Sequence, residues 1–342
     1  HQEARRQRQM CIRDRIIVQE ARCVRDQCGF DLGVGLWLPE AVISNLIYDA
    51  TFTTSVASLL ADQGMRCFSL NAFPFGDFHS ERVKENVYLP DWSDVRRLEY
   101  TQRCRQFLAG ILNGNDEGSI STLPLAYKQA EQSSDFSKRV IDQLLQLARY
   151  LDTLHNETGK IIRLAIEPEP FCVLETTSET VQFFERLWDA ADKVALGGVV
   201  RQHIGVCYDV CHQAVEFENP STAIRELTEA DIRINKVQIS CAIELDNPTS
   251  EKARQALATF AEQRYLHQTF AQHSDGRVIS HTDLSQELAL DPPAEWSQAE
   301  RWRVHFHVPV DADRLGPLGT TRPELIQALH ALGPVSYTHL TL

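Results

Sequence analysis

Long apolar runs are missing from this chain of 342 residues, and none approaches the roughly 18 residues that a helix needs to cross a bilayer. Basic residues are scarce relative to acidic ones, because 34 lysines and arginines face 47 aspartates and glutamates for a formal charge of -13. Such a charge repels phosphate backbones, and no local basic patch offsets it. The sequence therefore predicts no membrane span and no nucleic-acid partner, and favours a small polar metabolite.

Several common motifs are absent as well. The nine cysteines are odd in number and lack paired CxxC spacings, which is typical of reduced thiols and favours a cytoplasmic location. The chain has no glycine-rich phosphate loop, no GxSxG nucleophile elbow and no zinc-knuckle spacing. These absences argue against a P-loop enzyme, a serine hydrolase and a disulfide-stabilised secreted domain.

The two ends of the chain differ in character from the rest. Residues 1–15 are basic and lack the apolar segment of a signal peptide. The segments MCIRDR near the start and VSYTHLTL at the end resemble translated sequencing-adapter read-through. We interpret 1–15 and 335–342 as tails of non-native sequence, with a basic nucleic-acid-binding arm as the alternative for the first. Residues 16–334 are expected to form one domain.

Strand-like and helix-like segments alternate between these ends, which is typical of a parallel sheet with crossover helices. The spacing suits an α/β fold of the (β/α)8 TIM-barrel type. Because a helix-like stretch precedes the first strand and no strand follows the helix that ends at Leu332, we expect the barrel to lack its first and last strands. The expected strands are 31–38, 66–73, 118–124, 161–168, 203–209, 234–240 and 303–310.

The helical segments carry recognisable signals. Thr176 with Glu179, and Thr321 with Glu324, have the spacing of capping boxes at helix starts. The long polar segment 245–302 is predicted to be an elaborated loop with one or two helices over the barrel mouth. One helix should present an apolar stripe made of Val140, Leu144, Leu147, Leu151 and Leu154.

Two strand-like segments end abruptly in possible metal ligands. LAIEPEP places Glu167 at the end of one strand, and GVCYDVCH places Asp209 at the end of another with His212 three residues on. Parallel-barrel enzymes place their functional groups at the carboxyl ends of strands, and carboxylates with an imidazole suit Mg²⁺, Mn²⁺ or Zn²⁺. The alternative is that these carboxylates cap helices or pair with arginine.

Two histidines alternate along VHFHV, so His305 and His307 lie on one face of a strand. We favour a metal-binding role for both over core histidines bonded to backbone carbonyls. Candidate contacts with a substrate come from other strand ends and loops, and for each of them a purely structural role stays open. They are Glu169, Gln238, Asn71, Phe73, His79, Lys84 and His267.

LAIEPEP, GVCYDVCH and the alternating histidines resemble the xylose-isomerase-like TIM barrels, which include sugar (phosphate) isomerases, epimerases and nucleases of the endonuclease IV type. Further segments within residues 16–334 resemble the EboE metabolite-traffic proteins. That resemblance implies an enzyme or enzyme-like protein encoded with other ebo genes, and linked to movement of a metabolite towards the periplasm. The segments are 73–76, 82–92, 117–122, 215–218, 265–268 and 304–310.

The resemblance also implies a ligand set of a glutamate, an aspartate, a histidine and a glutamate from the last strand. The first two correspond to Glu167 and Asp209, and His212 matches the histidine of the nuclease-type DxxH. The third position holds Gln238, and the last glutamate has no counterpart. His305 and His307 resemble the paired-ligand region of the nuclease branch.

Three functions follow from these expectations. The first is isomerase or epimerase chemistry, in which Glu167 binds the metal and moves a proton next to a substrate carbonyl while Glu169 contacts the substrate. The second is phosphodiester hydrolysis at several metals, which the acidic charge disfavours. The third is a non-catalytic metabolite-binding protein, which Gln238 favours.

Overall fold

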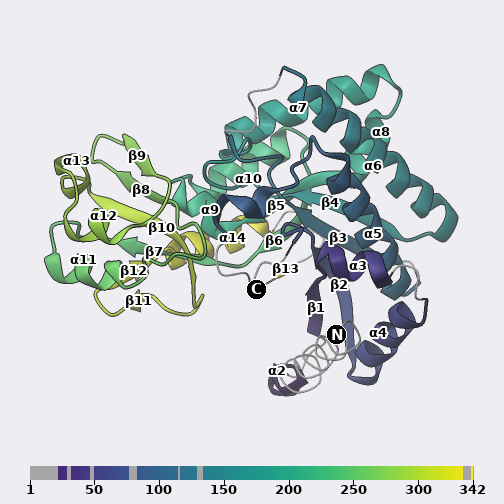
Figure 1. Ribbon diagram of the computed structural model, residues 1–342, viewed down its shortest axis with the longest axis horizontal. Coiled ribbons are helices and arrows are strands. Elements are labelled where there is room, and N and C mark those ends of the chain that lie inside the picture. Colours follow the sequence, from purple (N-terminus) through teal and green to yellow (C-terminus); the bar gives the residue numbers. More distant parts are fainter. Residues whose placement is uncertain are drawn as a thin grey trace.

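The computed structural model describes residues 22–28, 32–46, 50–76, 83–114, 116–128, 134–333 and 340–341. Its main sheet is parallel throughout and follows chain order, and it curls into a half-barrel (Figure 1). The strands are β1 (Leu32–Trp37), β2 (Met65–Asn71), β3 (Glu117–Thr122), β4 (Ile161–Ile166), β5 (Ile204–Asp209) and β6 (Ile234–Gln238), with the short β13 (Leu340–Thr341) beside β6.

Helices cover the outer face of this half-barrel, and strands β3 to β6 are buried almost throughout, as parallel strands require, whereas β1 is partly exposed. All six residues of β5 are buried. The helices and turns of this layer are α2 (Arg22–Cys28), α3 (Glu40–Leu46), α4 (Ala50–Asp62), the 3-10 turn η2 (Lys84–Tyr88), α5 (Val95–Ile111), α6 (Phe136–Thr158), α7 (Thr177–Lys193), α8 (Gly197–His203), α9 (Val210–Val215) and α10 (Pro220–Glu229).

The predicted fold class is confirmed. The first six predicted strands form in the predicted order, and within the described residues the barrel is open rather than closed. The apolar stripe of α6 is buried at Val140, Leu144, Leu147 and Leu151. The capping box at Thr176 is present with both of its hydrogen bonds. None of the described helices is both long and apolar enough to cross a membrane.

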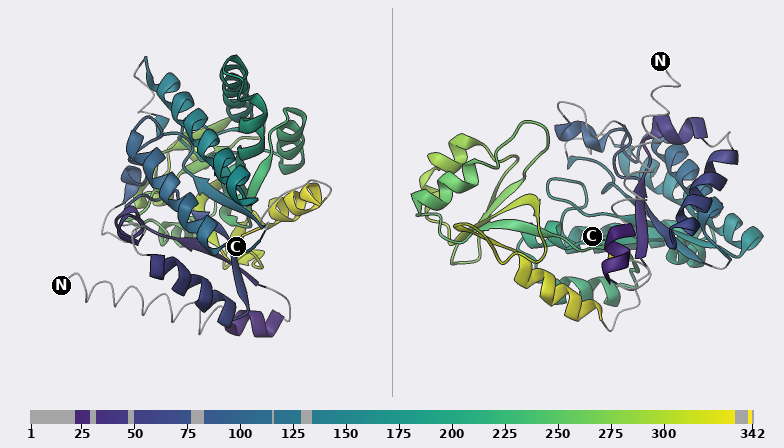
Figure 2. Two further views of the ribbon diagram at one scale, coloured as in Figure 1. Left: turned by 90° about the vertical axis from the view of Figure 1, so that its right-hand side faces the viewer. Right: turned by 90° about the horizontal axis from the view of Figure 1, so that it is seen from below.

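A second, antiparallel sheet lies beside the half-barrel (Figure 2). Its strand order is β11-β12-β7-β10-β8-β9. The strands are β7 (Cys241–Leu245), β8 (Thr269–Gln272), β9 (Val278–His281), β10 (Arg301–Val308), β11 (Arg314–Leu315) and β12 (Leu318–Thr320). The accompanying helices are α11 (Glu251–Ala258), α12 (Gln286–Leu290), α13 (Ala294–Ser297) and α14 (Arg322–Leu332).

This sheet corrects two expectations. The strand predicted at 303–310 forms at Arg301–Val308, but it pairs with β7 and β8 instead of extending the barrel. The segment 245–302 contains strands as well as helices. The reason is the connection after β6: Ile239 and Ser240 alone separate it from β7. Two residues cannot hold the crossover that a further parallel strand needs.

The second predicted capping box is wrong. The Thr321 hydroxyl accepts from the backbone N–H of Ala242 at 2.8 Å and makes no cap hydrogen bond with α14. Glu324 instead pairs with Arg303 of β10. Both side chains tie α14 to the antiparallel sheet, and one cluster of buried apolar side chains extends through both sheets. This packing fixes β10 against the carboxyl ends of the barrel strands.

Candidate metal centre

The carboxyl ends of β4 and β5 bring Glu167 and Asp209 to the mouth of the half-barrel. Asp209 also begins α9, where its Oδ1 accepts from the N–H groups of Cys211 (2.8 Å) and His212 (3.3 Å). The Ser240 hydroxyl donates to the same oxygen at 2.6 Å. The turn into α9 carries His212 back towards the strand end, so its Nε2 lies 3.7 Å from Asp209 Oδ2. Asp209 therefore caps a helix with one oxygen and faces the site with the other.

Two carboxylate oxygens in this site lack a partner. Asp209 Oδ2 and Glu167 Oε2 are both buried, and neither has a hydrogen-bond donor among the described residues. The other oxygen of Glu167 lies 3.9 Å from His212 Nδ1. Burying an unpartnered carboxylate oxygen is costly, and a cation bound to such an oxygen removes that cost. The residues present therefore fit a divalent metal ion.

Hydrogen bonds fix the orientation of two histidines. His212 Nδ1 lies 2.9 Å from the carbonyl oxygen of Pro168, which can only accept, so Nδ1 carries the proton. His305 Nδ1 lies 2.8 Å from Gln268 Oε1, and the Gln268 amide nitrogen faces acceptors on Glu169 and Pro170. Both rings therefore keep Nε2 free for a metal, which is how metal-binding histidines are usually held.

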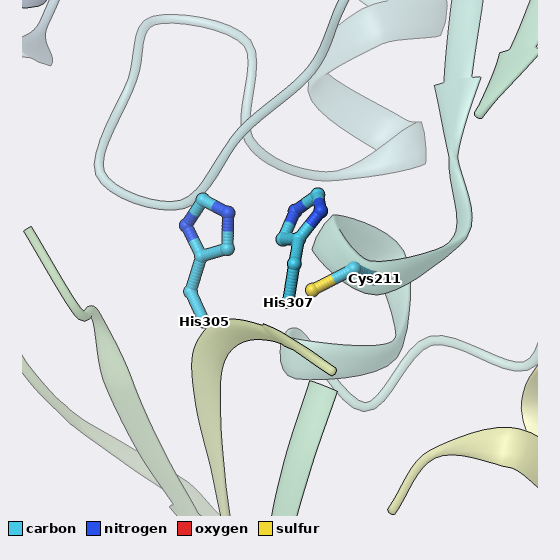
Figure 3. A group of neighbouring side chains, drawn as sticks. All are labelled: Cys211, His305 and His307. Carbon is cyan, nitrogen blue, oxygen red and sulfur yellow. The ribbon is translucent and has the colours of Figure 1, made fainter. Parts of the chain in front are cut away.

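Strand β10 delivers the other two histidines to the same place. The ring centroid of His212 lies 4.5 Å from that of His305 and 6.1 Å from that of His307. Figure 3 shows His305 and His307 side by side, with Cys211 of α9 next to His307. Three overlapping groups have all their donor atoms within 4.8 Å of one another: Cys211 with His305 and His307, Glu169 with His212 and His305, and Asp209 with His212 and His307.

Opposite charges in the site influence one another's titration. Burial acts to raise the pKa of Asp209, but His212, His307 and the Ser240 hydrogen bond outweigh it, so the pKa is lowered. Burial acts to lower the pKa of His212, but the nearby carboxylates, Asp209 first, outweigh it and the pKa is raised. Both shifts arise from the attraction between the His212 imidazole and the carboxylates around it.

The remaining groups shift in the direction that burial dictates. Burial raises the pKa of Glu167 to about 7, and it also raises that of Glu169. Burial, reinforced by His212 and His307, holds the pKa of His305 well below its ordinary value. His305 therefore stays neutral, with a lone pair for a metal. Glu167 is poised to exchange a proton near neutral pH.

A cavity of about 490 Å³ opens above these ligands. Of the predicted substrate contacts, Glu169, Gln238, Asn71, Phe73, Lys84 and His267 all line it, and His79 lies outside the described residues. Lys84 is held there by the carbonyls of Glu262 and Tyr265 and by the carboxylate of Asp283, at 3.2, 2.7 and 2.5 Å. It thus joins η2 to the antiparallel sheet rather than offering a free ammonium group.

Sequence patterns missed the residues that support the ligands. The Tyr88 hydroxyl donates to Glu169 at 2.8 Å, and the amide of the fully buried Gln268 reaches the same pair. Ser240 was missed although it lies just two residues beyond Gln238, at a strand end. A hydroxyl side chain at the end of a predicted strand could have been used to predict the role of Ser240. Tyr88 and Gln268 lie in the segments 82–92 and 265–268, but no sequence pattern there shows what they contact. Their role depends on contacts between distant segments.

No family model and no curated protein matches this chain. Among solved structures it is similar to an L-ribulose 3-epimerase at 16% identity and a TM-score of 0.41, covering 62% of this chain and 60% of that one. It is also similar to an AP endonuclease, family 2, from Brucella melitensis, at 15% identity and a TM-score of 0.42, with 64% of this chain and 72% of that one covered. A third similar structure is a xylose isomerase-like TIM barrel protein from Mycobacterium smegmatis in complex with magnesium, at 13% identity and a TM-score of 0.43. The match covers 81% of this chain and 85% of that one.

Of these three neighbours, the Mycobacterium smegmatis protein is described as a xylose isomerase-like TIM barrel. The chain spans about 60% of the length of the epimerase. At such identities and scores the likeness carries no argument about chemistry. What the site can do follows from its own geometry.

Proposed function

We propose that this chain is a divalent-metal-dependent isomerase or epimerase that acts on a sugar-like carbonyl compound. The observation that carries the proposal is the pair of unpartnered buried oxygens, Glu167 Oε2 and Asp209 Oδ2, at the carboxyl ends of adjacent parallel strands. The carboxylates of both residues lie within 4 Å of His212 ring nitrogens. The metal would be Mn²⁺, Mg²⁺ or Zn²⁺, which carboxylate and imidazole ligands accept.

Asp209, His212 and His307, whose donor atoms lie within 4.8 Å of one another, would hold the ion. Glu167 and His305 would be further ligands beside them. A bound divalent ion would polarise the carbonyl and hydroxyl oxygens of the substrate. Glu167 would move the proton from the carbon next to the carbonyl, because its carboxylate lines the cavity beside the other ligands.

Three other residues would serve these steps. Gln238 and Asn71, which line the cavity, would bind substrate hydroxyls. Glu169, which accepts hydrogen bonds from Tyr88 and Gln268, would hold the His305 ring in place through Gln268.

We further propose that the protein belongs with the EboE metabolite-traffic proteins and works in the cytoplasm on a small metabolite, with other ebo-encoded proteins as partners and no nucleic acid. The support is the series of sequence segments that keep their order along the chain. The structure adds context for one of them: the segment 265–268 supplies both Gln268, which orients His305, and His267, which lines the cavity.

Solvent exchange tests the catalytic proposal. Mn²⁺-loaded protein incubated with an α-hydroxyketone such as D-fructose in D₂O should incorporate deuterium at the carbon beside the carbonyl, as detected by proton NMR. Glu167→Gln should abolish exchange, whereas Glu157→Gln, at an exposed position on α6, should leave it unchanged. Absence of exchange across a panel of ketoses and aldoses that bind the protein would contradict catalysis.

Two other functions each have one supporting observation. Gln238 offers an amide where the family resemblance implies a histidine ligand, which favours a metabolite-binding protein without turnover. The three overlapping donor groups could hold more than one ion, which favours a phosphodiesterase of the endonuclease IV type. The formal charge of -13 weighs against that nuclease function.

A further inference from the structure

The cavity above the metal centre is polar at one end and apolar along one wall. Glu167, Glu169 and the histidines form the polar end. The apolar wall combines side chains of η2 and of the loop before it with others from the antiparallel sheet. Its members are Phe73, Pro74, Val83, Val87, Leu266 and Phe306.

The rings of this wall are fixed before any ligand arrives. Phe73 packs edge-on against Tyr88, with ring centroids 5.8 Å apart. Phe306 packs edge-on against Phe260 at 5.1 Å and stacks on His267 at 4.8 Å. A rigid apolar surface binds an apolar ligand group with little ordering cost. The wall is therefore suited to a flat or ring-shaped part of a ligand.

Positive charge is scarce around the cavity. Among the described residues that line it, Lys84 is the sole lysine or arginine. Its ammonium group already has three acceptors, one of them the carboxylate of Asp283 at 2.5 Å. The two lining carboxylates, Glu167 and Glu169, would repel an anion, and the charge of a bound metal would be offset by its own ligands. Within the described part of the lining, a phosphate group would find no lysine or arginine that lacks acceptors.

We propose that the cavity selects an uncharged α-hydroxycarbonyl compound that carries an apolar, ring-sized group, and that it does not select a sugar phosphate. The metal end takes the hydroxyl and carbonyl oxygens, while the wall covers the apolar group. The volume of about 490 Å³ accommodates both parts of such a molecule. This inference rests on the proposed metal-dependent function and narrows its substrate class.

Three probes that share one chelating group separate the possibilities. Hydroxyacetone, 2-hydroxyacetophenone and dihydroxyacetone phosphate all present a hydroxyl next to a ketone, and they differ in carrying a methyl, a phenyl or a phosphate-bearing group. Binding to Mn²⁺-loaded protein is read from the relaxation of water protons at the metal. We expect 2-hydroxyacetophenone to bind at least about tenfold more tightly than hydroxyacetone, and dihydroxyacetone phosphate no more tightly than hydroxyacetone.

The possible outcomes distinguish a wrong substrate class from a wrong metal-dependent function. If all three probes perturb the bound Mn²⁺ and dihydroxyacetone phosphate binds most tightly, the substrate class is overturned and the metal-dependent function stands. If the protein binds Mn²⁺ and none of the probes perturbs it, both the substrate class and the proposed chemistry fail.

A variant that adds the missing charge gives an independent check. Val87→Lys places an ammonium group on the apolar wall, and it should strengthen binding of dihydroxyacetone phosphate by about tenfold while weakening that of 2-hydroxyacetophenone. Leu89→Lys is the matched control, because Leu89 is 56% exposed in the same segment and does not line the cavity. Equal effects of the two variants would contradict the proposed position of the wall.

Discussion

His305 donates its Nδ1 proton to Oε1 of Gln268 across 2.8 Å. Through Gln268, this bond joins strand β10 to the carboxylate of Glu169 at the mouth of the half-barrel. The amide nitrogen of Gln268 lies 3.4 Å from Glu169 Oε1 and 3.2 Å from the Tyr88 hydroxyl. A single buried side chain thus sets which nitrogen of His305 faces the site. The antiparallel sheet supports the metal centre through this contact.

Replacing Gln268 should weaken metal binding without unfolding the protein. In Gln268→Leu the His305 ring loses its acceptor and can turn or change tautomer, so we expect Mn²⁺ affinity to fall roughly 10- to 100-fold, as measured by calorimetric titration. Gln255→Leu is the control, because Gln255 contacts only Glu251 on the surface of α11. Unchanged affinity in Gln268→Leu would mean that His305 is not a ligand.

Replacing Lys84 should affect stability more than metal binding. Lys84→Met removes three hydrogen bonds between η2 and the antiparallel sheet with its loops, and it leaves Asp283 Oδ2 without the lysine, while Oδ1 keeps the N–H of His267. The free energy of unfolding in urea should fall by about 1–3 kcal/mol while the Mn²⁺ stoichiometry stays the same. Lys138→Met, which removes only an exposed pair with Asp142, should change stability by less than about 0.5 kcal/mol. Loss of the metal in Lys84→Met would show that the clamp shapes the centre itself.

Glu216 should make the stability of the protein depend on pH. Burial, together with neighbouring Glu175, raises the pKa of Glu216 to about 10, so the folded protein holds this proton more tightly than the unfolded chain does. The resulting stabilisation is complete below the pKa of the unfolded state, near 4.5, and is lost as pH rises towards about 10.

Glu216→Gln mimics the neutral form and should therefore flatten this dependence. At pH 8 its thermal unfolding temperature should exceed that of the unmodified protein, by a stabilisation on the order of 1 kcal/mol. Glu229→Gln, at an exposed position at the end of α10, should leave the pH profile as it was. Identical profiles for Glu216→Gln and the parent protein would refute the buried proton.

Metal uptake should strengthen with rising pH. A proton competes with the ion for Glu167, whose pKa is raised to about 7 by burial, and also for His212, whose pKa is raised by its carboxylate neighbours despite burial. The apparent Mn²⁺ affinity should therefore increase from pH 5.5 and level off above the pKa values of both groups, as followed by the EPR signal of free Mn²⁺. A flat profile across pH 6–8 would exclude Glu167 as a ligand.

The sequence was sufficient for the half-barrel because each of its strands is a short apolar run that ends at a distinct polar or proline-containing segment. It was also sufficient to predict that Glu167, Asp209 and His212 lie close together, because chain order alone places parallel strand ends together. The sequence correctly predicted a strand that carries His305 and His307, but it did not show to which sheet this strand belongs. An alternation of period two looks the same in a parallel and an antiparallel sheet. The two-residue link after Gln238 was the missed signal.

Hydrogen bonds between residues distant in sequence could not be predicted from the sequence, for a different reason. Thr321 and Glu324 have the spacing of a helix cap, yet their hydrogen bonds go to Ala242 and Arg303 because tertiary partners compete with the local ones. Gln268 lies 37 residues from His305, and nothing in its immediate sequence points to an imidazole. Such contacts emerge only once two sheets are packed together.

Metal stoichiometry tests the central claim most directly. Elemental analysis of protein loaded with Mn²⁺ or Zn²⁺ and then freed of excess ion should give at least one ion per chain. Glu167→Gln and Asp209→Asn should each lose it, and the exposed-site variant Glu157→Gln should retain it. No bound metal in the parent protein, or full retention in both ligand variants, would contradict a metal centre at the mouth of the half-barrel.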